Sequence, residues 1–178
     1  FTGDTNPDGN EVVIYGDELY LNGDNSTLFG FDSTSVTVTG SNGLVEGNTL
    51  MNISLFGGEG SLIKDNTGGT IKIDRSDHNK VFGNTIQRVR ILGFGADDQA
   101  LNNHIGGINP GERNYITGYG TWNSEGLPSG TTVQISDTAG TRIEGNWIGT
   151  TPDGLSQGSL ASNVGIGLQG ENHVTSIR

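Results

Sequence analysis

The sequence predicts an all-β fold built as a parallel β-solenoid, in which short strands stack coil upon coil. Residues 34–106 repeat one pattern four times, with anchor asparagines spaced 18, 18 and 19 residues apart at Asn48, Asn66, Asn84 and Asn103. An apolar-x-apolar triplet lies ahead of each anchor, at Val36/Val38, Ile53/Leu55, Ile71/Ile73 and Val89/Ile91. A fixed period with strand-type alternation, and without helical spacing, is typical of a β-solenoid.

The composition fits this architecture better than it fits an ordinary globular core. Only 31% of the residues are hydrophobic and 31 of the 178 are glycine, a balance that would otherwise suggest disorder. A solenoid buries only a narrow apolar column, and its tight corners favour glycine and asparagine because both accept a left-handed backbone. We expect one domain over residues 1–178, with an N-terminal turn and cap strand (1–18), regular coils (19–106) and coils with inserted loops (107–178).

The charge and the hydropathy exclude several classes of partner. Nine Lys and Arg residues face 20 Asp and Glu residues, which gives a net charge of −11. Nucleic-acid binding needs a basic face, so we expect no nucleic-acid partner. No run approaches the roughly 18 apolar residues of a membrane span, so membrane insertion is not expected. The chain has no cysteine and therefore no disulfide.

The N-terminal stretch contains half of a calcium-loop pattern. Asp4, Asn6 and Asp8, followed by Gly9, match D-x-[DN]-x-[DN]-G, but the twelfth position, which calls for a bidentate Glu, is Tyr15. An ordinary turn is the favoured interpretation and a weak calcium site the alternative. No other cofactor is expected.

The regular coils begin at Leu19/Leu21, which lie 17 residues before Val36/Val38, with residues 12–15 as a cap strand. Stacked coils lie about 4.8 Å apart, so residues one period apart lie over one another. Alternation turns the apolar pairs inward. It turns outward a column made of Tyr20, Thr37, Ser54, Lys72 and Arg90. We also expect the recurring asparagines to bond one another in a structural ladder of Asn48, Asn66, Asn84, Asn103, Asn146 and Asn172.

After residue 106 the coils lengthen, and short motifs become specific. Asn103-His-Ile-Gly-Gly, Pro110-Gly-Glu-Arg-Asn114-Tyr-Ile-Thr-Gly and Gly145-Asn-Trp-Ile-Gly-Thr resemble bacterial right-handed parallel β-helix repeat proteins, which carry N-x-I-G-G, P-G-x-R-N-x-I-S-G-N and G-N-x-I-G-T. The resemblance covers roughly residues 84–178 and, more loosely, 34–83. It implies a single-stranded right-handed β-helix, a secreted or surface location and a scaffold role. The 18-residue coils are shorter than is usual in that family, and the chain stops at Arg178 without an obvious cap.

A left-handed hexapeptide solenoid is the competing fold, because 18 residues make three hexads. Val38, Leu44, Leu50, Phe56 and Leu62 do lie six residues apart. The series then reaches Gly68, Asp74 and Lys80, which cannot fill an apolar column. The right-handed fold is therefore retained.

One candidate catalytic set is Lys72, Arg90 and Asp74, on or beside the outward column. Right-handed β-helix polysaccharide lyases use cations and carboxylates on such a face to neutralise a uronate and abstract its proton. A solvated ion pair balanced by Asp74 is the favoured interpretation.

A second set, Asp97 and Asp98 with His104, resembles the carboxylates of β-helix glycoside hydrolases. The partner motifs of that family are missing, and a corner turn explains GADDQ better.

Exposed aromatic residues form the candidate carbohydrate-binding site: Tyr115, Tyr119, Trp122 and Trp147. Aromatic rings stack on sugar faces, and inserted loops present them. Sealing of the corners of the solenoid is an equally good explanation.

Two functional hypotheses follow. The leading one is a non-enzymatic extracellular, cell-surface or virion-surface solenoid with a structural, adhesive or fibre role, which associates with itself and binds glycans through its loops. The alternative is a carbohydrate-active enzyme, a lyase before a hydrolase.

Overall fold

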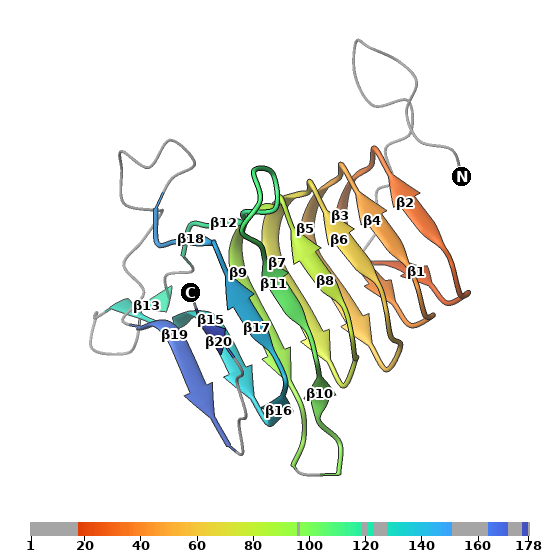
Figure 1. Ribbon diagram of the computed structural model, residues 1–178. Helices are drawn as coiled ribbons and strands as arrows, with labels where there is room; N and C mark the ends of the chain where they lie inside the picture. Colours follow the sequence, from red (N-terminus) through yellow and green to blue (C-terminus); the bar gives the residue numbers. More distant parts are fainter. Residues whose placement is uncertain are drawn as a thin grey trace.

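The computed structural model describes residues 18–95, 97–118, 121–122, 128–150, 164–170 and 176–177. In these ranges the regular structure is all β, with no helix and hence no helix that could cross a membrane. Most of the strands belong to two parallel sheets, and Figure 1 shows them side by side from β1 and β2 at one end of the molecule to β19 and β20 at the other.

The first sheet has the order β1-β3-β5-β7-β9-β12-β18. Its regular strands are β1 (Leu19–Leu21), β3 (Asp32–Val38), β5 (Thr49–Phe56), β7 (Thr67–Asp74) and β9 (Thr85–Leu92). Strand β9 pairs along its first part with β12 and along its second part with β15, which in turn pairs with β19. These later strands are β12 (Tyr115–Ile116), β15 (Thr131–Ser136), β18 (Trp147–Ile148) and β19 (Val164–Gln169).

The second sheet has the order β2-β4-β6-β8-β11-β17-β20. Its strands are β2 (Thr27–Phe29), β4 (Leu44–Glu46), β6 (Leu62–Lys64), β8 (Lys80–Phe82), β11 (His104–Gly106), β17 (Arg142–Glu144) and β20 (Ser176–Ile177). Two small sheets pair β10 (Ala100–Leu101) with β16 (Thr138–Ala139) and β13 (Thr121–Trp122) with β14 (Pro128–Ser129). The chain alternates between the two large sheets, which is compatible with a β-solenoid.

The core is the apolar column that the alternation predicts. The side chains assigned to the inside are at most 3% exposed: Val36, Val38, Ile53, Leu55, Ile71, Ile73, Val89 and Ile91. Leu19 and Leu21 pair with Val36 and Val38, so the predicted first coil is confirmed. The outward column is confirmed as well, because each of its members is the register partner of the next.

Left-handed residues recur at the corners, where the chain turns from one strand to the next. One such column holds the φ values of 53–70° that a tight corner needs, at Asn25, Asn42, Gly60, His78, Asn102 and Gly140. Successive members bond their coils together, since the backbone N–H of Asn42 donates to Glu59 and that of Gly60 to Asp77. Asparagine and glycine tolerate this backbone, which explains their abundance in the sequence.

A buried asparagine ladder runs beside the second sheet, but its membership differs from the prediction. Each side-chain Nδ2 donates to the next Oδ1 at 2.9–3.0 Å along Asn48, Asn66, Asn84, Asn114 and Asn146. The prediction that placed Asn103 after Asn84 is wrong. Asn103 instead accepts from Asn79, whose own Oδ1 accepts the backbone N–H of Ser61 in a second ladder.

Insertions account for this error. Asn79 and Asn103 are 24 residues apart and Asn84 and Asn114 are 30 apart, against 18 in the regular coils. An insertion of six residues in one coil therefore moved an asparagine of the second ladder close to the position expected for the first.

Several predicted residues lie outside the described part of the chain. They are the candidate calcium ligands Asp4, Asn6 and Asp8, the cap strand at 12–15, the aromatic Tyr119 and the ladder residue Asn172. Trp122 belongs to β13, and its side chain is likewise not described.

Candidate functional site

A groove of about 790 Å³ lies over the outward side of the first sheet, lined by residues of β3, β5, β7 and β9 and by Thr117. Two adjacent glycines in β7 form part of it. A Cβ atom on Gly68 would lie 1.7 Å from the carbonyl oxygen of Leu50, and one on Gly69 would lie 2.2 Å from that of Met51. The chain therefore lies close against β5 only because these two positions carry no side chain.

Three cationic side chains line the groove: Lys72, Arg88 and Arg90. Lys72 and Arg90 are register partners on the neighbouring strands β7 and β9, about 4.8 Å apart. Arg88 lies two residues before Arg90, so the two side chains leave the same face of β9. Gln134 on β15 accepts from both guanidinium groups, with its Oε1 2.9 Å from Arg88 Nη2 and 3.1 Å from Arg90 Nε.

The predicted catalytic set is only partly assembled in the groove. Lys72 and Arg90 line it, whereas Asp74 is 4% exposed and is not among the lining residues. The Asp74 carboxylate binds Lys72 Nζ at 2.5 Å and Arg75 Nε at 3.2 Å. Among the described residues that line the groove, Asp32 carries the only carboxylate, and it lies on β3, two strands away from β7.

Rows of hydroxyl and amide groups border the cations. Thr49, Thr67 and Thr85 are successive register partners, and all three line the groove. A second row places Asn52 and Thr70 in register with Arg88. Such groups donate to and accept from ligand hydroxyls along the direction of the stack.

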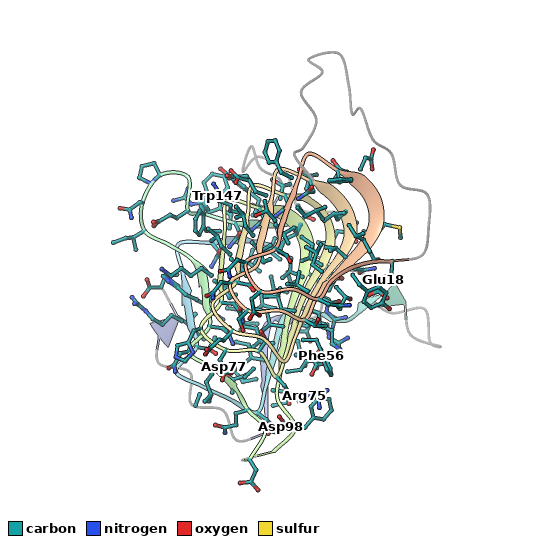
Figure 2. The ribbon with its side chains drawn as sticks, turned by 90° about the vertical axis from the view of Figure 1, so that its right-hand side faces the viewer. Glu18, Phe56, Arg75, Asp77, Asp98 and Trp147 are labelled. Atoms are coloured by element: carbon teal, nitrogen blue, oxygen red, sulfur yellow. The ribbon has the colours of Figure 1, made fainter. Side chains whose placement is uncertain are left out.

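The threonine row continues into an aromatic pair. Tyr115 is the register partner of Thr85, and Trp147 is the register partner of Tyr115. Their ring centroids are 5.3 Å apart at an interplanar angle of 83°, and the Arg113 guanidinium lies 4.9 Å from the Trp147 ring centroid. Both aromatic side chains are half-buried (Trp147 is labelled in Figure 2).

The carboxylates and the histidine of the second candidate set contact different partners. Asp98 Oδ2 lies 3.5 Å from Arg75, whose guanidinium also contacts the rings of Phe56 and Phe94 at 4.4 and 5.2 Å (Figure 2). His104 on β11 instead lies 3.5 Å from the buried carboxylate of Glu144. Elsewhere in the described ranges, no group of three His, Cys, Asp or Glu residues is arranged to hold a metal ion.

Two carboxylates near the ends of the site have pKa values below the ordinary glutamate range. The side-chain hydroxyl of Thr37 and then that of Tyr20 lower the pKa of Glu18 by hydrogen bonding. In the turn that precedes Tyr115, the side-chain and backbone amides of Asn109 lower the pKa of Glu112. Both groups are therefore ionised over the whole physiological pH range.

Comparisons with family models, with curated proteins and with solved structures find no match to this chain. Its function is therefore inferred from the groove.

Proposed function

We propose that this chain is a non-enzymatic, extracellular glycan-binding module built on a right-handed parallel β-helix. The observation that carries the proposal is the groove, in which hydroxyl and amide rows run along the stack and continue into the Tyr115–Trp147 pair. A polysaccharide presents repeated hydroxyl groups and apolar sugar faces, and this surface complements both.

Three observations support the finer fold and the location. The sheets are parallel with coils of 18 residues or more. The motifs around Asn103, Asn114 and Asn146 resemble those of bacterial right-handed β-helix repeat proteins, many of which are secreted or surface-attached. The corresponding roles are adhesive or structural, at a cell or virion surface.

The arrangement of Asp74 favours binding over catalysis. A lyase requires a base that is free to take the proton next to a uronate carboxylate. The Asp74 carboxylate is engaged by Lys72 and Arg75 and is turned away from the groove lining. Incubation with polyuronates, followed by the ultraviolet absorbance of unsaturated products, tests this point; sustained turnover would replace the binding proposal by the lyase alternative.

Replacing Trp147 by alanine is expected to weaken glycan binding about tenfold, because it removes one aromatic face and frees the Tyr115 ring that packs against it. Binding is measured by calorimetry with ligands selected on a glycan array. Phe94→Ala is the matched control, since Phe94 is a 63% exposed aromatic that lies away from the groove residues. Equal losses in the two variants would contradict the assigned role of the aromatic pair.

Self-association is a second proposal, carried by the sheet edges. In the described part of the chain, β1 and β2 are the end strands of the two large sheets. End strands present backbone groups that pair with strands of another copy. We expect the mass measured by light scattering to rise with protein concentration; a constant monomeric mass would reject this proposal.

A further inference from the structure

We propose that Lys72, Arg88 and Arg90 form a binding site for the acidic groups of an anionic polysaccharide, and that Gln134 positions the two arginines for it. This inference rests on the proposed glycan-binding function and assigns the class of glycan. It is carried by the placement of the three cations in one groove and by the uncharged group that holds two of them.

The three cations are arranged over two strands of one face. Lys72 and Arg90 are register partners about 4.8 Å apart, and Arg88 and Arg90 are separated by two residues, about 6.6 Å along β9. The distance between coils is comparable to the length of one sugar ring along a polysaccharide. Acidic groups on neighbouring sugars would therefore meet cations on neighbouring coils.

Gln134 orders the arginines without adding a negative charge. It is the register partner of Arg90, and its Oε1 accepts from Arg88 Nη2 and from Arg90 Nε at the same time. Its own Nε2 donates to Gln169 Oε1 at 3.4 Å, which fixes the orientation of the amide. Because this acceptor is neutral, the Arg90 guanidinium keeps its charge for a ligand carboxylate or sulfate.

Other cations of the described chain are held differently. Lys64 binds Glu46 at 2.6 Å and Arg142 binds Glu144 at 2.7 Å, both on the second sheet. Arg75 contacts two carboxylates, those of Asp74 and Asp98. A carboxylate partner is thus the common arrangement on this protein of net charge −11, and an amide partner at Arg90 marks a different use.

An acidic glycan fits this site better than a nucleic acid does. A nucleic acid carries a phosphate at every nucleotide and needs a basic surface of matching extent, which a chain with 9 Lys and Arg residues and 20 Asp and Glu residues does not offer. A polyuronate or a sulfated polysaccharide also supplies the hydroxyl groups that the threonine row is placed to bind.

The test uses matched polymers and one isosteric substitution. Polygalacturonate is compared with its methyl ester, dextran sulfate with dextran, and single-stranded DNA is included as a third polyanion. We expect the native chain to bind each acidic polymer at least about tenfold more tightly than its neutral counterpart, and added salt to reduce that preference.

Gln134→Glu places a carboxylate between the two arginines with almost no change of shape. We expect it to abolish the acidic preference and to leave binding of the neutral polymers unchanged. Asn102→Asp makes the same chemical change at an exposed corner residue away from the groove, and it is expected to keep the preference. Arg90→Gln provides a second variant, and circular dichroism establishes that all three variants fold.

The outcomes separate the two proposals. Equal affinity for acidic and neutral polymers would overturn the anion site but leave glycan binding intact, whereas no binding to any polysaccharide would overturn both. A preference lost equally in Gln134→Glu and Asn102→Asp would show a general charge effect and overturn the assigned site. Tighter binding of single-stranded DNA than of either acidic polysaccharide would overturn the assignment of the ligand class.

Discussion

Replacing Asn84 by alanine is expected to lower the free energy of unfolding by about 3 kcal/mol or more, because several buried polar groups would lose their partner together. Asn84 is fully buried. Its Oδ1 accepts from the backbone N–H and the Nδ2 of Asn66, while its Nδ2 donates to the carbonyl groups of Ile63 and Phe82. Alanine leaves these groups without bonds and leaves a gap that is too small to hydrate them well.

Urea unfolding of the variant beside the native chain measures the loss. Asn52→Ala is the matched control, since Asn52 is an exposed asparagine of β5 whose amide donates to the hydroxyl of Ser35. Its expected cost is within about 0.5 kcal/mol. A similar small cost for Asn84→Ala would contradict a structural role of the ladder.

Replacing Gly68 by alanine is expected to cost about 3 kcal/mol and to deform the groove. The new Cβ atom would lie 1.7 Å from the carbonyl oxygen of Leu50, which is backbone and cannot rotate away. Strands β5 and β7 would have to separate at this point. Because Leu50, Gly68 and Ile86 are successive register partners that line the groove, its floor would move with them.

Thermal unfolding and glycan affinity should therefore fall together in Gly68→Ala. Gly165→Ala is the control, since a Cβ atom there has no neighbour within 4 Å and the residue also lies in a strand of the first sheet. An unchanged melting temperature in Gly68→Ala would mean that the close approach of β7 to β5 is not required.

The sequence predicted the strands of the regular coils because two periods coincide there. An alternation of two residues within each triplet and a period of 17 or 18 residues between triplets specify both the face and the register of residues such as Ile53 and Ile71. Both signals weaken after Leu92, where the coils acquire insertions. The misassigned Asn103 is a direct result, since spacing alone does not distinguish two ladders that both use asparagine.

The groove and its ordering residue were beyond the reach of the pattern. Gly68 and Gly69 look like corner glycines in the sequence, whereas they lie within β7. Gln134 is 44 residues from Arg90 along the chain, and their pairing depends on how a long insertion returns to the sheet. The pairing of β9 with both β12 and β15 might have been sought from the length of β9, which exceeds that of either partner.

The asparagine ladder also determines where this architecture tolerates change. Its rungs are separated by 18, 18, 30 and 32 residues, yet every rung makes the same Nδ2-to-Oδ1 bond. The ladder thus keeps successive coils aligned irrespective of how much chain lies between them. New loops can be grafted between rungs without redesigning the scaffold, so the stack offers a framework on which binding surfaces can be exchanged one coil at a time.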